Sequence, residues 1–151
     1  MPMQQTLKET VSLEGIGLHT GAETVVTIKP APAGSGITFV RSDLADRVEI
    51  KADIDNVVDL ARGTAIGKGD AKIHTLEHIM GAFAGLGVDN AVVEVNAPEV
   101  PQMDGSALPF VEAITSAGLV EQSEHREYIT IDEPMDYVEG DLALGVYPSD
   151  H

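Results

Sequence analysis

The sequence predicts an α+β fold: a mostly antiparallel sheet packed against two helices as a two-layer sandwich, followed by the opening strands of a truncated second domain. Short stretches rich in β-branched residues, separated by glycine and proline turns, fill the first third of the chain. Two segments with apolar residues at helical spacing follow, near residues 73–86 and 106–117, and a glycine ends each.

The predicted strands are short and lie between turns. The first third holds four of them, at residues 6–13, 23–29, 37–41 and 48–52. A hairpin with a glycine-rich turn is expected within residues 59–73, and a β-rich strand within 88–96. A strand at 128–132 and a hairpin around residues 139–141 complete the prediction. The number of strands joined by turns favours antiparallel pairing.

We expect a first α+β domain over residues 1–122, a linker at 123–127, and the start of an incomplete second domain at 128–151. The linker is expected because residues 121–127 are uniformly polar. The strands after it carry apolar residues but have no helix of their own to cover them. That pattern is typical of the first strands of a domain whose remainder is missing. The chain would then be either a fragment of a longer protein or a natural remnant.

The composition excludes some function classes. The chain has 25 acidic and 9 basic residues, a formal net charge of −16, which disfavours nucleic acid as a partner. Cysteine is absent, so disulfides and cysteine-based metal sites are excluded. No apolar run approaches the ~20 residues of a membrane helix, and the N-terminus does not resemble a secretory signal. We therefore expect a cytoplasmic protein without a membrane span.

The segment at residues 73–86 is the predicted central helix. Its apolar residues fall on one broad face, while His74, Glu77 and His78 lie on the other with glycine and alanine. That second face has no lysine or arginine, unlike an ordinary solvent-facing surface. We expect it to be covered by something outside residues 1–122. A glutamate and a histidine on a covered face require a partner, a metal or a reaction.

His74, Glu77 and His78 form an H-x-x-E-H pattern, which is used by a class of zinc peptidases. A glutamate next to a histidine suits metal-assisted hydrolysis, because one group holds the ion and the other moves the proton. The same pattern also occurs in a helix with two hydrogen-bonded, semi-buried histidines. From the helix alone, a structural role, a metal or catalytic role and a peptidase all remain open.

Three stretches together resemble a known family. They are the glycine loop at residues 15–21, the helix start at 74–78 with its small-residue tail to 90, and the segment 96–107, which reads NAPEVPQMDGSA. In this order and spacing they resemble the N-terminal part of UDP-3-O-acyl-N-acetylglucosamine deacetylase, the zinc hydrolase of lipid A biosynthesis. The resemblance implies two domains of similar topology with the active site between them.

The resemblance also implies roles for particular residues. His78 stands at the position of the first of three zinc ligands, and Glu77 at that of the general base that activates water for attack on the N-acetyl carbonyl. His19 matches a histidine near the active site, where it would contact substrate. The other ligands, a His and an Asp, belong to the missing second domain. His74 receives no role, and Asp104 reads as a turn and helix-capping carboxylate.

The predicted function is therefore zinc-dependent hydrolysis of the N-acetyl group of UDP-3-O-acyl-N-acetylglucosamine. This chain would supply only the first-domain part of the site and would be inactive alone, because a catalytic zinc needs three protein ligands. Its expected partners are that substrate and the missing second domain. Two alternatives are a non-catalytic remnant that binds a partner through the central helix, and a small H-x-x-E-H metallopeptidase.

Overall fold

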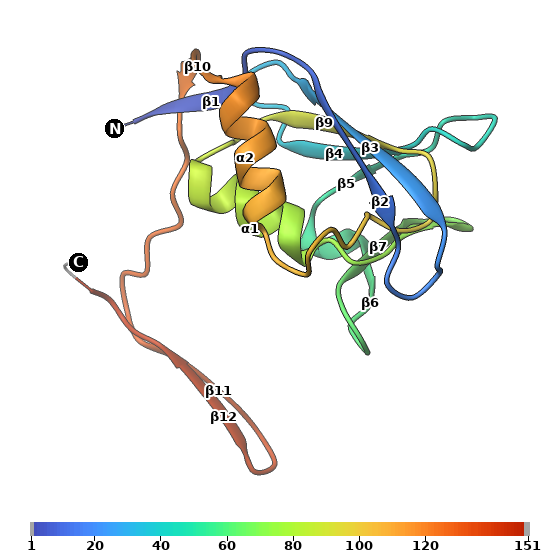
Figure 1. Ribbon diagram of the computed structural model, residues 1–151. Helices are drawn as coiled ribbons and strands as arrows, with labels where there is room; N and C mark the ends of the chain where they lie inside the picture. The colour runs from blue at the N-terminus through green and yellow to red at the C-terminus, as the bar shows by residue number, and fades with distance from the viewer. Residues whose placement is uncertain (1, 150–151) are drawn as a thin grey trace.

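The computed structural model describes residues 2–149, and its main body is a sheet with two helices (Figure 1). The strands and helices are β1 (Met3–Leu7), β2 (Val11–Ile16), β3 (Glu23–Pro30), β4 (Ile37–Arg41), β5 (Glu49–Lys51), the short 3-10 helix η1 (Ile54–Asn56), β6 (Val57–Asp59), β7 (Ala65–Lys68), β8 (Ala71–Ile73), α1 (Glu77–Leu86), β9 (Ala91–Val95), α2 (Leu108–Ala117), β10 (Leu119–His125), β11 (Met135–Glu139) and β12 (Leu142–Val146). Among the described residues, two α-helices interrupt a series of strands, one on each side of β9.

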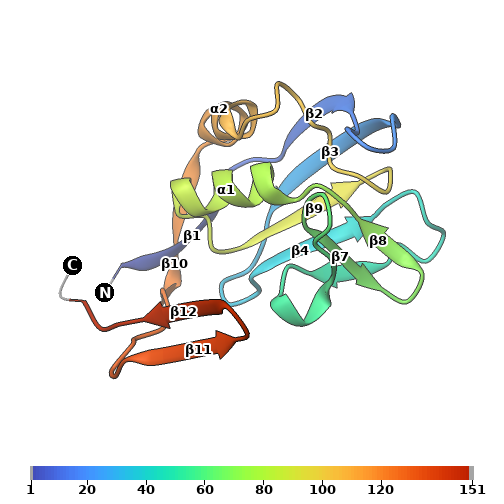
Figure 2. The same ribbon diagram turned by 90° about the horizontal axis from the view of Figure 1, so that it is seen from below.

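The main sheet has five strands in the order β2-β3-β9-β4-β5. All neighbours run antiparallel except β4 and β9, which are parallel and align Phe39 with Val93. Both helices lie on the same face of this sheet (Figure 2). The α+β class and the two-layer arrangement predicted from the sequence are therefore confirmed.

The core lies between the helices and the sheet. Its aromatic centre is Phe39 on β4, Phe83 on α1 and Phe110 on α2, each at most 1% exposed. In β9 every second residue is buried, which is the pattern of a sheet covered on one face. Burial of apolar area supplies the main stabilisation of such a layered fold, at roughly 25 cal/mol per Å². The helix face predicted to be apolar is the one that packs on the sheet.

The predicted strand at residues 6–13 is two strands. β1 ends at Leu7 and pairs with β10, whereas β2 begins at Val11 and pairs with β3. Between them, the N–H of Lys8 donates to the carbonyl of Gly118. The alternation in the sequence runs through both strands, although the burial of β1 itself does not alternate, so periodicity alone did not reveal the break.

A second, three-stranded sheet leads into α1. It has the order β6-β7-β8, and β7 and β8 form the expected hairpin with Gly69 at φ +60° in its turn. Ala65, Ile66 and Ala71 in this hairpin are buried. The hairpin therefore fixes where the chain arrives at the start of α1.

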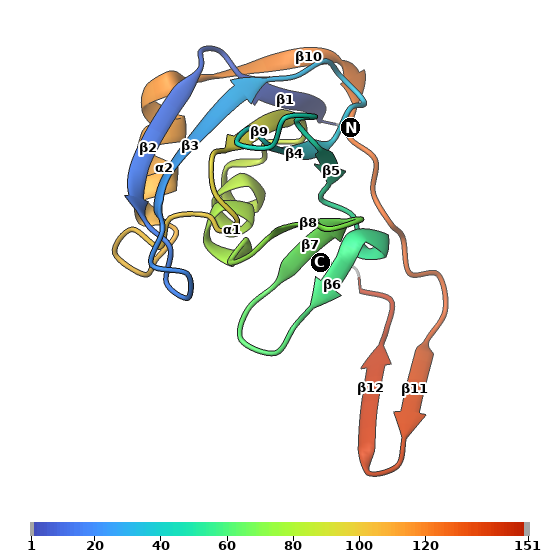
Figure 3. The same cartoon turned by 90° about the vertical axis from the view of Figure 1, so that its right-hand side faces the viewer.

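The C-terminal hairpin β11–β12 extends away from the body (Figures 1 and 3). It confirms the hairpin predicted around residues 139–141, but residues 128–132 are not a strand. β10 runs to His125, so strand structure reaches into the stretch expected to be a linker. Every residue of β11 and β12 is exposed. The division into two domains stays a prediction.

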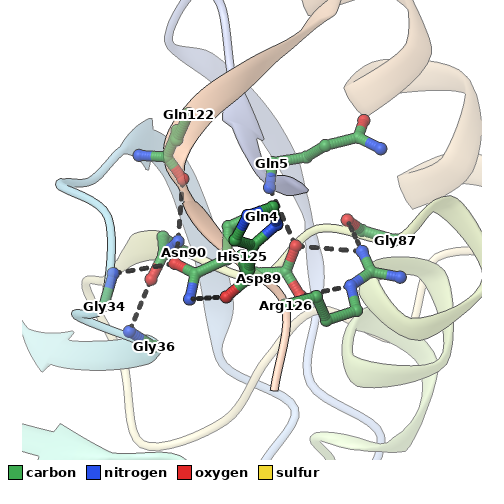
Figure 4. Close-up of polar contacts among 10 residues, drawn as sticks. All are labelled: Gln4, Gln5, Gly34, Gly36, Gly87, Asp89, Asn90, Gln122, His125 and Arg126. Carbon is green, nitrogen blue, oxygen red and sulfur yellow. Dashed lines mark hydrogen bonds and ion pairs between the residues drawn. The ribbon is translucent and has the colours of Figure 1, made fainter. Parts of the chain in front are cut away.

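A polar network joins the end of β10 to the end of α1 (Figure 4). The guanidinium of Arg126 donates to both carboxylate oxygens of Asp89, at 2.8 and 2.9 Å, and to the carbonyl of Gly87 at 2.6 Å. Asp89 also accepts from the N–H of Gln5 at 2.8 Å. A cation at a helix C-terminus is favourable because it faces the negative end of the helix dipole. The network thus anchors the last residue before the exposed segment.

Asn90 extends this network to the neighbouring loop. Its side-chain amide donates to Gln4 at 2.9 Å and to Gln122 at 2.7 Å, and its oxygen accepts from the N–H of Gly36 at 2.8 Å (Figure 4). Asn90 is buried, and these bonds satisfy its amide.

No helix within residues 2–149 has the length and apolar character required to cross a membrane.

Candidate functional site

Helix α1 begins at Glu77, four residues later than the predicted start at Ile73. His74 instead forms a parallel bridge with Glu99: its N–H donates to the carbonyl of Pro98, and its carbonyl accepts from Val100. Thr75 then has φ +61°, a left-handed conformation that no helix interior accepts. The prediction of two histidines on one helix is therefore wrong, because a strand-like contact holds the first of them.

The other end of α1 matches the sequence prediction. Gly87 has φ +72° and caps the helix in the left-handed conformation that glycine adopts without strain. On the side of α1 away from the core, Glu77, Gly81 and Gly85 are exposed. Nothing among residues 2–149 covers this surface, so the cover that we expected stays a prediction.

Glu77 is the first residue of α1, and its carboxylate is oriented by a neighbouring loop. Its Oε1 accepts from the backbone N–H of Thr64. A Cβ on Gly63 would lie 2.9 Å from the same oxygen, so any larger residue at position 63 would displace the Glu77 carboxylate. Glu77 is exposed and makes no ion pair among the described residues. Its carboxyl group is thus oriented by one backbone hydrogen bond and open to solvent.

His78, the next residue, is half-buried, and its Nδ1 is buried without a hydrogen-bond partner among the described residues. Leaving a buried polar atom unpaired typically costs about 1–3 kcal/mol, so native proteins rarely do so without cause. Hydrogen bonds from Ser106 are the main reason that the pKa of the exposed Asp104 carboxyl is below its usual range, and His78 makes the smallest of the contributions that lower it. The helix start therefore lies close to the loop that precedes α2.

Glu99 is the residue that sequence reasoning missed. It is fully buried, and its two carboxylate oxygens accept hydrogen bonds from four donors. The donors are the N–H of His19 at 3.1 Å, the N–H of Thr20 at 2.8 Å, and the hydroxyls of Thr20 and Thr75, both at 2.7 Å. Glu99 therefore joins the glycine loop to the residues just before α1.

The hydrogen bonds also determine the charge state of Glu99. Burial by itself would raise the pKa of this carboxyl, since it disfavours the charged form. The hydroxyls of Thr75 and Thr20 and the backbone N–H groups of Thr20 and His19 outweigh burial and lower the pKa to about 2. Glu99 is consequently an ionised, fully satisfied structural carboxylate at neutral pH.

Gly17 explains why the loop at residues 15–21 is rich in glycine. A Cβ at this position would overlap the Oε2 of Glu99 and the Oγ1 of Thr20. The residue must therefore lack a side chain so that the loop can close around the carboxylate.

His19 is exposed on this loop and lines a small hollow of about 30 Å³ together with His74. The remaining lining residues are Asp59, Arg62, Gly63 and Thr75. Gly63, which lines the same hollow as His19, lies next to the carboxylate of Glu77, although Glu77 itself is not part of the lining. The other side of Glu77 borders an apolar cavity of about 210 Å³.

Asp104 has the turn role that the sequence predicts. Its Oδ1 accepts from the N–H of Ser106 at 2.9 Å and from the Ser106 hydroxyl at 2.8 Å. Ser106 in turn accepts from the N–H of Leu108, the first residue of α2, at 3.1 Å. The residue at the N-cap position is Ala107, which has no side chain able to cap the helix.

The described residues fit one zinc ligand. His78, whose Nδ1 is buried without a hydrogen-bond partner among the described residues, stands next to the accessible carboxylate of Glu77, and this pair of residues suits a metal-assisted hydrolytic site. Within residues 2–149, however, no group of three or more His, Cys, Asp or Glu side chains is arranged to hold a metal ion. A catalytic zinc here would need further ligands from outside this part of the chain.

Comparison with known proteins supports the resemblance. The family model described as LpxC, UDP-3-O-acyl N-acetylglycosamine deacetylase, matches residues 4–151. The chain is 48% identical over 151 residues to the UDP-3-O-acyl-N-acetylglucosamine deacetylase of Citrifermentans bemidjiense, covering 100% of this chain and 50% of that protein. It is 49% identical over 150 residues to the enzyme of the same name from Methylococcus capsulatus, covering 99% of this chain and 49% of that protein.

A longer relative also matches. The chain is 52% identical over 134 residues to the bifunctional enzyme LpxC/FabZ of Chlorobaculum tepidum, covering 89% of this chain and 29% of that protein. The chain thus spans about half the length of the curated deacetylases it matches, and less of the bifunctional relative.

Proposed function

The chain belongs to the LpxC family of UDP-3-O-acyl N-acetylglycosamine deacetylases, and from that premise we propose that it supplies part of a deacetylase site. The reaction is hydrolysis of the N-acetyl group of UDP-3-O-acyl-N-acetylglucosamine in lipid A biosynthesis, carried out in the cytoplasm. The observation that carries the proposal is the pair at the start of α1. Glu77 offers a fixed, accessible carboxylate, and His78 has an unpaired ring nitrogen.

Glu77 acts as the general base in this proposal. Its carboxylate is oriented by the N–H of Thr64, and the exposed face of α1 leaves room for a water molecule beside it. It accepts the proton of the water that attacks the N-acetyl carbonyl. Because the Thr64 bond occupies only Oε1, the other carboxylate oxygen is available for that proton.

His78 holds the zinc ion in this proposal, together with ligands from the remainder of a longer protein. When bound, zinc polarises a carbonyl and makes its water more acidic. His19 contributes a side chain at the edge of the hollow beside Glu77, where it contacts substrate. Residues 2–149 offer too few ligands for a catalytic zinc, so we propose that the chain is inactive without that remainder.

The two alternative functions now differ in their support. A zinc peptidase of the H-x-x-E-H type needs both histidines on one helix, and His74 lies outside α1. The geometry therefore disfavours the peptidase. A non-catalytic module that binds a partner through α1 is favoured by the exposed small residues Gly81 and Gly85. It predicts that substitution of Glu77 would leave function unchanged.

A deacetylation assay tests the proposal. The joined protein, defined as this chain followed by the part of the Citrifermentans bemidjiense deacetylase that lies beyond the match, should release acetate from the UDP-sugar in a zinc-dependent manner. We expect His78→Ala and Glu77→Gln to abolish release, and the 151-residue chain alone to show none. Robust turnover by the chain alone would contradict the claim that it is incomplete, and full activity of Glu77→Gln would contradict the assigned base.

A further inference from the structure

Strands β1 and β10 form a separate two-stranded sheet, and the residues that follow α1 hold both of them. A two-stranded sheet is only marginally stable by itself in water, so contacts with the rest of the protein have to stabilise it. Asp89 and Asn90, just after the cap of α1 at Gly87, make such contacts with each strand (Figure 4). The partners are Gln5 and Arg126 for Asp89, and Gln4 and Gln122 for Asn90.

Asp89 holds the chain at the point where it leaves β10. Its carboxylate accepts from the N–H of Gln5 on β1, and from Nε and Nη2 of Arg126 at 2.8 and 2.9 Å. Two parallel hydrogen bonds between a guanidinium and a carboxylate are stronger and more directional than a single one. The backbone N–H of Arg126 also donates to the carbonyl of Pro2 at 2.9 Å. Arg126 is therefore held through both its side chain and its backbone.

Gly87 leaves room for the guanidinium at the end of α1. Nη2 of Arg126 donates to the carbonyl of Gly87 at 2.6 Å, and a Cβ at residue 87 would lie 2.8 Å from the same nitrogen. The glycine thus has two functions: it ends α1 in the left-handed conformation, and it allows Arg126 to reach the helix terminus. A cation at this position is favoured by the helix dipole.

Helix α1 connects this contact to the candidate site. Glu77 and His78 lie in its first turn and Gly87 caps its other end, about 15 Å away for ten residues at 1.5 Å per residue. The residues directly after Arg126, 127–130, are exposed. The contact of Arg126 with the end of α1 therefore fixes the place from which the following segment leaves, relative to the two residues of the site.

We propose that Arg126 is a positioning residue for the hydrolytic site. Its bonds to Asp89 and Gly87 keep the segment after β10 in a fixed relation to α1, so that zinc ligands from the remainder of a longer protein meet His78. A misplacement of about 1 Å in such a site costs up to about 100-fold in rate. The effect on catalysis rests on the proposed function, whereas the attachment of the segment does not.

Hydrogen exchange of the 151-residue chain tests the attachment without any turnover. We expect Arg126→Gln to accelerate exchange of the amide of residue 126 by about tenfold relative to its intrinsic rate, as for the loss of one charge-assisted hydrogen bond. Asp89→Asn keeps an acceptor for the N–H of Gln5 but removes the charge, and should act in the same direction. Arg47→Gln is the matched control, because it breaks an ion pair with Glu94 elsewhere in the protein, and should leave this amide unchanged.

The joined protein tests the positioning role. Competition with a chelator, under conditions where all variants are folded, should give a zinc affinity about tenfold weaker in Arg126→Gln than in Arg47→Gln, and kcat should fall by a similar factor. A role of Arg126 in stability alone would lower the midpoint of urea unfolding and leave the zinc affinity of the folded protein unchanged.

Two results would overturn the proposal. One is unchanged exchange at residue 126 in Arg126→Gln, and the other is wild-type zinc affinity and kcat in an Arg126→Gln joined protein. A joined protein of wild-type sequence that neither binds zinc nor releases acetate would contradict the proposed function instead. The exchange measurement would then still decide whether Arg126 holds the segment.

Discussion

Two glutamates on either side of the site differ in almost every physical respect. Glu99 is fully buried, accepts from four donors and has its pKa lowered to about 2. Glu77 is exposed and accepts one backbone hydrogen bond. A carboxylate with all its acceptor positions filled holds structure together, whereas one with an open oxygen can take a proton. We therefore assign a structural role to Glu99 and a catalytic role to Glu77.

The largest expected effect comes from removing the buried carboxylate. Glu99→Ala leaves the donors of His19, Thr20 and Thr75 without their acceptor, and we expect the free energy of unfolding to fall by about 4 kcal/mol. Urea unfolding followed by circular dichroism measures it. Glu112→Ala, an exposed position on α2, is the matched control and should change little. Equal stability of the two variants would contradict the architectural role.

The lowered pKa of Glu99 predicts a specific dependence of stability on pH. A pKa of about 2 in the folded chain against 4.5 when unfolded contributes roughly 3 kcal/mol, fully present above pH 4.5 and lost as pH falls toward 2. Other carboxylates titrate in the same range, so the difference between the wild type and Glu99→Gln isolates this residue. Unfolding curves at pH 6, 4 and 2 should show that difference shrinking. A constant difference would reject the low pKa.

Gly63 lies in the loop that holds the carboxylate of Glu77. Gly63→Ala adds a Cβ 2.9 Å from the Oε1 of Glu77 at a residue with φ +150°, and we expect a loss of about 1 kcal/mol together with reduced deacetylation by the joined protein. Gly34→Ala is the control, because Gly34 also has a positive φ but open space around it. It should lose similar stability and keep its activity. Similar activity of both variants would show that the loop does not orient Glu77.

The smallest expected effect on stability belongs to Glu77 itself. Glu77→Gln replaces an exposed carboxylate that makes one hydrogen bond, and we expect the free energy of unfolding to change by less than about 0.5 kcal/mol. Thermal unfolding measures this change. A loss as large as that of Glu99→Ala would show that Glu77 also has a structural role, and would contradict the difference that we draw between the two glutamates.

The sequence predicted elements whose signals are local. The strand at residues 23–29, the strand at 37–41, the hairpin around 139–141 and the cap at Gly87 depend on alternation, turn residues or a left-handed glycine, and the structure has all of them. The prediction missed that β1 pairs with β10 whereas β2 pairs with β3, because the residues of the two strands read as one alternating run.

The missed features depend on contacts between distant residues. Glu99 lies about 80 positions from His19 and Thr20, and no periodicity announces such a contact. The start of α1 was predicted too early for the same reason, because the bridge between His74 and Glu99 prevents the helix from forming there despite the helical pattern. The NAPE sequence around Glu99 was a usable signal, because a glutamate between two prolines in an otherwise apolar segment is expensive to bury without partners.

The most direct test of the account is the rate of deacetylation by the joined protein carrying Glu77→Gln, divided by its folded fraction. We predict a fall of at least about 100-fold, the usual contribution of a positioned general base, with the folded fraction unchanged. A rate within a few-fold of the wild type would contradict the assignment of the chemistry to Glu77.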